Sequence, residues 1–179
     1  MITRRADITD LERLYGFYDA VIDQQSHDQY GPDWTKGIYP SEDDIRSHLE
    51  KGEFLLVCQD GQIAGAAVLS LGEEEMYKAG NWARKVPDEE VAIVHLLAVS
   101  PAFRHQGVSG ILMDYLLEEA RRMARVIHLD VVCGNLPALK LYQRHGFTSA
   151  GQLEVYYEDT GDIVVELLQY DLEKPAEQN

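Results

Sequence analysis

The sequence predicts an α/β fold in which parallel and antiparallel strands share a sheet. Apolar strand-like runs alternate with segments of helical periodicity along the 179 residues. A run at 91–99, a helix from about Gly107 and a run at 126–133 form a strand–helix–strand unit, which implies two parallel strands joined by a right-handed crossover. Asp60 and Gly61 lie between two apolar runs and are a hairpin signal, so antiparallel pairing is expected as well.

The N-terminal half supplies a first strand and two helices. We expect the strand at 2–6, followed by capping side chains at 7–10 and a helix with apolar residues at helical spacing. Ser41 and Asp44 fit the capping box of a second, short helix. Between the helices, residues 30–40 combine turn formers with aromatic side chains, which indicates a loop on the substrate side.

The central part contains the hairpin and the helix of the crossover unit. The hairpin strands are expected at 54–59 and 63–71, and a polar excursion at 72–90 leads to the next strand. The helix after Gly107 carries apolar residues that recur on one face: Val108, Ile111, Leu112, Tyr115 and Leu116. That face is expected to be buried.

The C-terminal part completes a sheet of about seven strands. Residues 135–146 begin with an Asn cap and a first-turn Pro and end with Gly, which predicts a short helix. Strands at 147–157 and 163–171 flank a turn at 159–162. We expect one domain over 1–172, followed by a polar tail at 173–179.

Composition excludes several classes of function. The formal net charge of -15 argues against a nucleic-acid partner and favours a cationic substrate. No apolar run approaches the roughly 20 residues of a membrane-spanning helix, and no signal-peptide pattern opens the chain, so we expect a cytoplasmic protein without a membrane partner. The spacing of Cys58 and Cys133 matches neither a metal site nor a redox pair, so no metal is expected.

The loop before the crossover helix has the layout of an anion-binding site. Arg104, Gly107 and Gly110 open the helix, where unpaired backbone N–H groups and the positive end of the helix dipole face any phosphate placed there. The expected ligand is a phosphorylated cofactor. A Walker loop and a G-x-G-x-x-G dinucleotide fingerprint are both absent from the sequence.

Three segments together resemble the GNAT superfamily of acyl-CoA-dependent N-acyltransferases. They are His95-Leu-Leu-Ala-Val99, the loop Arg104-His-Gln-Gly-Val-Ser-Gly110, and Asn135-x-x-Ala138-x-x-x-Tyr142 followed by Gly146-Phe147. The resemblance covers the C-terminal two thirds of the chain. The loop departs from the family pattern at Ser109, where Gly or Ala is usual; serine is small and keeps its backbone N–H, so phosphate contact is expected to survive.

The resemblance implies a mixed, mostly antiparallel sheet that is splayed between its fourth and fifth strands, with acetyl-CoA entering the split as co-substrate. It implies direct acetyl transfer to a primary amine in a ternary complex, without a metal. The cofactor-binding residues it points to are Leu97, Ala98, Val99, Arg104, His105, Gln106, Gly107, Val108, Ser109, Gly110, Asn135, Ala138 and Tyr142. Asn135 would hold the pantetheine amide or cap its helix.

Two residues are expected to be catalytic. Tyr142 occupies the family position of the acid that protonates the departing thiolate, and a core tyrosine is the alternative. His95 interrupts an apolar strand and suits a general base, since an alkyl amine is protonated at neutral pH; a half-buried structural histidine is the alternative. Backbone N–H groups of 97–99 would stabilise the oxyanion. Glu89 and Glu90 are rival bases.

The acceptor is less constrained by the sequence. The acidity of the chain suggests a small cationic amine, and a protein N-terminus or lysine is a second possibility. A non-catalytic acyl-CoA-binding sensor is an alternative from another class. His105, His128 and His145 are interpreted as a loop residue, a strand surface residue and a helix-end cation. A homodimer and the preferred acyl chain are left open.

Overall fold

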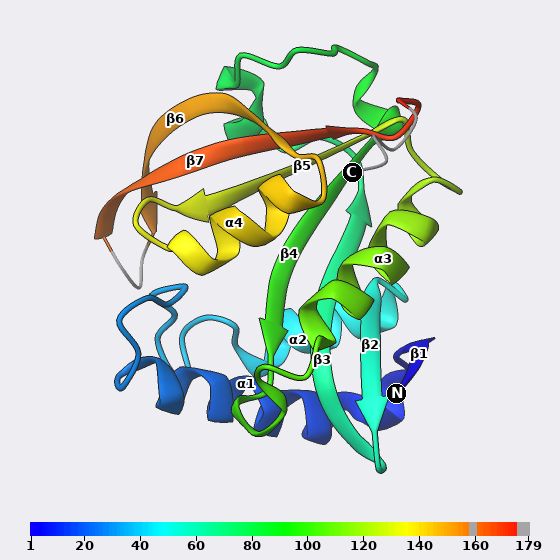
Figure 1. Ribbon diagram of the computed structural model, residues 1–179, viewed down its shortest axis with the longest axis vertical. Helices are drawn as coiled ribbons and strands as arrows, with labels where there is room; N and C mark the ends of the chain where they lie inside the picture. Colours follow the sequence, from blue (N-terminus) through cyan, green and yellow to red (C-terminus); the bar gives the residue numbers. More distant parts are fainter. Residues whose placement is uncertain (158–160, 175–179) are drawn as a thin grey trace.

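The computed structural model describes residues 1–157 and 161–174. Within these residues, seven strands form one sheet in the order β1-β2-β3-β4-β5-β7-β6, with four α-helices against it (Figure 1). All neighbouring strands are antiparallel except β4 and β5, which are parallel. The predicted mixed, mostly antiparallel sheet is therefore confirmed. Parts of the predicted turn at 159–162 and tail at 173–179 lie outside the described residues.

The elements follow the predicted order, and each strand ends within two residues of its expected bounds. The strands are β1 (Ile2–Arg5), β2 (Phe54–Gln59), β3 (Gln62–Leu71), β4 (Val91–Val99), β5 (Val126–Val132), β6 (Thr148–Tyr157) and β7 (Gly161–Asp171). The α-helices are α1 (Leu11–Gln25), α2 (Glu42–Glu50), α3 (Val108–Ala120) and α4 (Leu136–Arg144). Short 3-10 turns are η1 (Ile8–Asp10), η2 (Glu75–Ala79), η3 (Asp88–Glu90) and η4 (Pro101–Phe103).

Local sequence signals account for these boundaries. Asp60 and Gly61 have φ of 50° and 76°, which is typical of the type I′ turn that joins the twisted strands β2 and β3. The capping box at the start of α2 is formed, because the Ser41 hydroxyl accepts from the Asp44 N–H and the Asp44 carboxylate accepts from the Ser41 N–H. Asp7 caps η1, and α1 follows directly.

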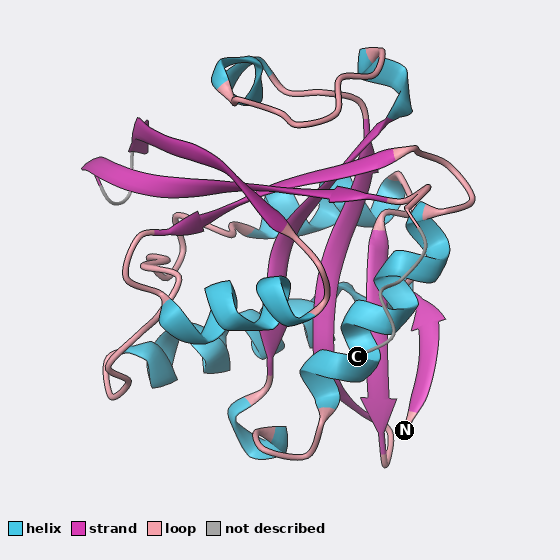
Figure 2. Ribbon diagram, turned by 45° about the horizontal axis from the view of Figure 1, so that its top comes forward, coloured by secondary structure: helices cyan, strands magenta, loops and turns pink. Residues whose placement is uncertain are grey.

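Three apolar clusters cover the two faces of the sheet. The helices α3 and α4 lie on one face and contribute Leu112, Leu116 and Tyr142 to the largest cluster. On the other face, α1 and α2 pack on the β1–β4 half, while the excursion 72–90 packs Tyr77 and Trp82 on β4, β5 and β7. Figure 2 shows this excursion as the loops and short helices at the top of the molecule. The excursion, and not an α-helix, therefore covers this face of the sheet over β4, β5 and β7.

Gly65 allows α3 to pack closely on β3. A Cβ at this position would lie 2.8 Å from Cγ1 of the buried, β-branched Val108, the first residue of α3. Gly65→Ala is expected to lower the free energy of unfolding by about 1–3 kcal/mol, the usual cost of overpacking a rigid core. Urea denaturation measures the loss.

Gly16 provides the matched control for this prediction. It lies within α1, and a Cβ there meets nothing within 4 Å. Gly16→Ala is therefore expected to raise the free energy of unfolding by about 0.5–1 kcal/mol, because alanine loses less backbone entropy in a helix. Equal effects of the two substitutions would contradict the packing argument.

The sheet opens between its two parallel strands. Among the described residues, β4 and β5 pair only at Val91↔Val126, Ala92↔Ile127 and Ile93↔His128. Beyond these pairs the strands diverge, although β4 continues for six residues to Val99 and β5 for four residues to Val132. The predicted splay between the fourth and fifth strands is therefore confirmed. Over 94–99 and 129–132, within the described part of the chain, β4 and β5 form no ladder with each other, which leaves a wedge-shaped opening (Figure 1).

Candidate active site

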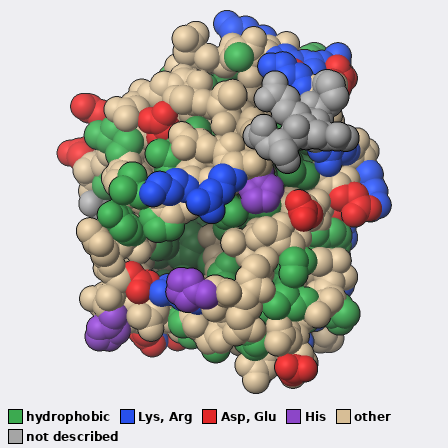
Figure 3. Space-filling view, in the orientation of Figure 1, with side chains coloured by type: hydrophobic (Ala, Val, Ile, Leu, Met, Phe, Trp, Pro, Cys, Tyr) green, Lys and Arg blue, Asp and Glu red, His purple; other side chains and the backbone are tan. Residues whose placement is uncertain are grey.

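A cavity of about 470 Å³ lies at this opening. It is lined from β4 and β5, from α4, from the loop between α1 and α2, and from η2. The lining residues are Pro32, Trp34, Ile38, Tyr39, His48, Glu74, Met76, Tyr77, Val94, His95, Leu96, Leu97, Asp130, Val131, Val132, Asn135, Ala138, Tyr142 and Ile163. Figure 3 shows this face hollowed, with hydrophobic side chains in the depth of the hollow and Lys, Arg and His side chains at its rim.

A bulge in β4 decides which side chains reach the cavity from each face. Val68 pairs with His95 and Ala66 with Ala98, so β4 carries one more residue than β3 over this stretch, and Leu96 has a φ of 54°. His95 and Ala98 thus share the face of α1 and α2, whereas Leu97 turns toward the cluster of α3 and α4. The bulge therefore interrupts the strand alternation: Leu96 shares the face of His95, and Leu97 lies on the opposite face.

The cavity consequently has two chemically different walls. Tyr142, Asn135 and Ala138 project from α4 on the face of the largest apolar cluster. His95 and Asp130 continue the Ile93↔His128 register by two residues on each strand, so strand alternation places both on the opposite face, with the excursion. The opening thus connects a wall from α4 with a wall rich in ionisable groups.

Tyr142 is nearly enclosed at the cavity, with 5% of its surface exposed. Its ring lies against that of Phe147, with centroids 5.4 Å apart. Burial raises the pKa of the Tyr142 phenol well above its ordinary value, and the nearby carboxylate of Asp130 adds to this because it disfavours a phenolate. The hydroxyl therefore stays protonated throughout the neutral range.

His95 has a carboxylate partner in the excursion. Its Nε2 lies 2.9 Å from Oε1 of Glu74, and this hydrogen bond holds the pKa of Glu74 below its usual value. With Glu74 ionised, Nε2 carries the proton and Nδ1 of a neutral imidazole has a free lone pair. The His48 ring stacks on that of His95 with centroids 6.4 Å apart, and it is held by Glu53. The geometry suits a base that receives a proton at Nδ1.

The predicted anion-binding loop leads into α3. Gly107 has a φ of 79° and no side chain caps the helix, so its first-turn N–H groups are available to a ligand. A Cβ at Gly110 would meet nothing within 4 Å, so the space beside the first turn is open. This loop does not line the cavity; among the predicted cofactor residues, the cavity touches Leu97, Asn135, Ala138 and Tyr142.

The loop between α1 and α2 is tied to both sides of the split. The Arg104 guanidinium donates to both carboxylate oxygens of Asp28, at 2.9 and 2.6 Å. On the other side, the Asn135 side chain caps α4 by accepting from Ala138 N, and its Nδ2 donates to the Gly31 carbonyl at 3.2 Å. Of the two roles expected for Asn135, the structure shows the cap, and the pantetheine contact stays a proposal. Both ties use residues that were predicted to hold the cofactor.

The Asp28 contact predicts an effect on cofactor affinity. Arg104 must leave Asp28 to bind a phosphate, and Asp28 itself repels one. Asp28→Asn is expected to lower the Kd of coenzyme A about two- to fivefold, because a partly exposed ion pair is worth at most about 1 kcal/mol. Titration calorimetry at low salt checks this, with Asp23→Asn as the control, since Asp23 pairs with Lys36 instead. Weaker binding in the Asp28 variant would contradict the prediction.

Two expectations about polar residues change. Glu90 lies in η3 and pairs with Arg125 at 3.1 Å, and neither Glu89 nor Glu90 lines the cavity, so these rival bases are not brought to the site. His128 was expected on the strand surface and is instead 2% exposed. The sequence interpretation was wrong there because the excursion covers this part of β5. Nδ1 of His145 donates to the Leu141 carbonyl oxygen, so this residue lies at the end of α4, as expected.

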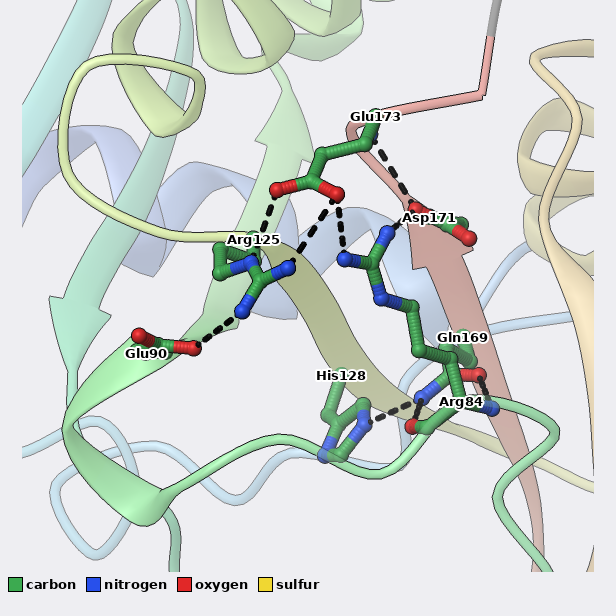
Figure 4. A network of polar contacts seen from close by, with 7 residues as sticks. All are labelled: Arg84, Glu90, Arg125, His128, Gln169, Asp171 and Glu173. Atoms are coloured by element: carbon green, nitrogen blue, oxygen red, sulfur yellow. Dashed lines mark hydrogen bonds and ion pairs between the residues drawn. The ribbon is translucent and has the colours of Figure 1, made fainter.

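His128 anchors the excursion through the network in Figure 4. The Gln169 side chain accepts from Arg84 N and donates to Arg84 O, so its nitrogen faces Nε2 of His128, 2.8 Å away. Nε2 is therefore the acceptor, and Nδ1 donates to Glu73 at 2.7 Å. The Trp82 ring stacks on the His128 imidazole, with ring centroids 3.6 Å apart. These contacts fix the segment that carries Glu74 and Tyr77 to the cavity.

Sequence reasoning missed Glu74 and Asp130. The Tyr77 hydroxyl donates to Oδ1 of Asp130 at 2.5 Å, and both residues line the cavity. The polar excursion gave no periodic signal that would have singled out Glu74. Asp130 follows His128 in a strand, and its alternation with the apolar residues of 127–131 was the signal that could have placed it on the face of His95.

Two searches of the described residues are negative. Within 1–157 and 161–174, no group of three or more His, Cys, Asp or Glu side chains is arranged to hold a metal ion. Over the same residues, every helix is too short or too polar to cross a bilayer.

The fold matches solved acetyltransferase structures. An acetyltransferase of the GNAT family from Streptococcus agalactiae 2603 superposes with a TM-score of 0.75 and 20% identity, covering 97% of this chain and 96% of that one. The structure of yncA from Salmonella typhimurium, solved with its cofactor acetyl-CoA, superposes with a TM-score of 0.70 and 19% identity. The match covers 99% of this chain and 97% of yncA. These similarities define the class of fold: a splayed sheet shared with acetyltransferases.

Sequence comparison is more specific. The model of the acetyltransferase (GNAT) family matches residues 19–147, and the chain therefore belongs to this family. It is 37% identical over 68 residues to the N-alpha-acetyltransferase RimI of Mycobacterium tuberculosis, which covers 38% of this chain and 42% of RimI. The chain spans less than half the length of the curated relatives it matches.

Proposed function

We propose that the protein transfers an acetyl group from acetyl-CoA to a primary amine by direct attack in a ternary complex. The observation that carries the proposal is the cavity at the β4–β5 split, where Tyr142 projects from one wall and the His95–Glu74 pair from the other. An acid and a base on opposite sides of one opening suit a reaction in which a proton leaves the nucleophile and another reaches the leaving group.

The residues present fit acetyl-CoA as the co-substrate. Its pyrophosphate would bind the first-turn N–H groups of α3, which have no side-chain cap, together with Arg104 and the loop residues His105, Gln106, Val108 and Ser109. The pantetheine arm would lie along the unpaired edge of β4 at 97–99, where Ala98 and Val99 supply backbone groups, and against Asn135 and Ala138. Bound there, the thioester supplies an acetyl group activated toward amines.

The protein's own groups would move two protons. His95 would take a proton from the acceptor ammonium at Nδ1, while Glu74 holds Nε2 and orients the ring. As the C–N bond forms and the C–S bond breaks, a β4 backbone N–H would stabilise the charge on the carbonyl oxygen. The Tyr142 hydroxyl would then donate its proton to the departing thiolate. The products are an N-acetyl amine and coenzyme A.

Thiol release from acetyl-CoA in a panel of small amines and peptides tests the proposal. Acceptor-dependent thiol release together with the acetylated amine in a mass spectrum would support it. Binding of acetyl-CoA without transfer to any acceptor would instead favour the non-catalytic sensor. The panel needs peptides with free N-termini, because the relative RimI is named as an N-alpha-acetyltransferase. Failure to bind coenzyme A at all would refute both functions.

A further inference from the structure

We propose that Asp130 binds a second cationic group of the acceptor, so that the acceptor is an alkyl amine that also carries a distant ammonium or guanidinium group. This inference rests on the proposed acetyl transfer, because it assigns the wall of the same cavity that lies opposite α4. It adds a residue that determines specificity.

Asp130 is held in place from the excursion. The Tyr77 hydroxyl donates to Oδ1 of Asp130 at 2.5 Å, and the buried Tyr77 ring packs edge-on against Trp82 at 6.3 Å. Trp82 is fixed in turn by its stacking on His128 and by its N–H bond to the Tyr77 carbonyl. The phenol thus fixes the Asp130 carboxylate at the wall of the cavity.

No lysine or arginine among the described residues lines the cavity beside Asp130. Among the described residues, the other titratable groups that line the cavity are Glu74, His48, His95 and three tyrosines, Tyr39, Tyr77 and Tyr142. Glu74 has His95 as its partner, whereas the hydrogen-bond partner of Asp130 is a neutral phenol. Desolvation raises the pKa of Asp130, although the Tyr77 bond and the nearby His95 both act to lower it. A cationic ligand would supply the missing charge.

The reacting amine itself is a poor candidate for this position. It must lose a proton before attack, and an ion pair with a carboxylate would raise its pKa and retain that proton. His95 suits the reacting amine because it can take the proton. Asp130 suits a group that stays charged throughout. Between them, Trp34, Tyr39 and Ile38 give the cavity apolar walls for the connecting methylene groups.

Calorimetry with coenzyme A-saturated protein tests the inference without relying on turnover. 1,4-Diaminobutane and 4-amino-1-butanol share a chain and a reacting amine but differ in the second group. The wild type is expected to bind the diamine at least tenfold more tightly, and also to acetylate it with a kcat/KM at least tenfold higher. Equal affinities for the two amines would overturn the inference, even if both are acetylated.

Asp130→Asn is expected to abolish the difference between the two amines. Because burial raises the pKa of Asp130, its ionised form costs folding free energy, so the variant should unfold at a urea concentration no lower than the wild type at pH 8. Asp114→Asn on the exposed face of α3 is the matched control and should keep the tenfold preference. A preference that survives in the Asp130 variant would overturn the inference. Loss of thiol release with every amine, while the diamine preference in binding persists, would refute the proposed function alone.

Discussion

Tyr142→Phe is expected to lower kcat about 100-fold or more and to leave the Kd of acetyl-CoA within about threefold of the wild type. The substitution removes only the hydroxyl, and a general acid contributes roughly 10²–10⁴ to a rate. The phenylalanine ring keeps the packing against Phe147 in the buried cluster, so the fold should persist. Stopped-time assays of thiol release and calorimetry with acetyl-CoA measure the two quantities.

The pH profile sharpens this prediction. Burial and the charge of Asp130 raise the pKa of Tyr142, so the acid form of the phenol persists to higher pH than in an ordinary tyrosine, which titrates near about 10. The kcat of the wild type should therefore show no alkaline decline due to Tyr142 below about pH 10. Tyr156→Phe is the control, since this tyrosine is 70% exposed on β6. An unchanged kcat in Tyr142→Phe would remove the residue from the mechanism.

Local signals predicted the elements well because each has a short-range physical cause. The turn at Asp60-Gly61, the capping box at Ser41 and the Asn135 cap each form within a few residues. The crossover from β4 through α3 to β5 followed from apolar periodicity and chain length. These features depend little on the rest of the fold, so the sequence was sufficient for them.

The splay and the residues of the candidate site required more than local signals. The splay was implied by the family resemblance alone, since nothing in the strand runs shows where pairing stops. The bulge at Leu96 breaks the strand alternation and moves Leu97 to the face opposite His95, and no single-strand pattern predicts it. Glu74 reaches His95 only because His128 and Gln169 anchor the excursion on β5 and β7. Such long-range contacts are invisible to periodicity.

Burial also reversed one sequence interpretation. His128 alternates with apolar residues along β5, which is typical of a strand with one solvated face. In this protein both faces of β5 are covered, one by α3 and α4 and the other by the excursion. The polar side chains on the second face therefore became a buried network and a cavity wall rather than surface. Because the excursion covers this face, Asp130 lies at the wall of a cavity and not on the open surface, which makes it a candidate for ligand binding.

His95→Gln is expected to lower kcat/KM about 100-fold at neutral pH. Glutamine can still donate a hydrogen bond to Glu74 but cannot take a proton from the acceptor. The hydrogen bond from His95 lowers the pKa of Glu74, so this carboxylate is ionised at neutral pH and leaves His95 as the group that takes the proton. Steady-state assays of thiol release at neutral pH measure the loss.

Glu74→Gln separates a base from its positioning partner. The imidazole would lose the anion that holds the proton on Nε2 but could still accept a proton, so a smaller loss of about tenfold in kcat/KM is expected. Measuring both variants with an acceptor of low amine pKa provides the control, since such an amine needs no base and should restore most of the activity of His95→Gln. If His95→Gln keeps the wild-type kcat/KM with an acceptor of ordinary amine pKa, another group takes the proton, and the role assigned to His95 is wrong.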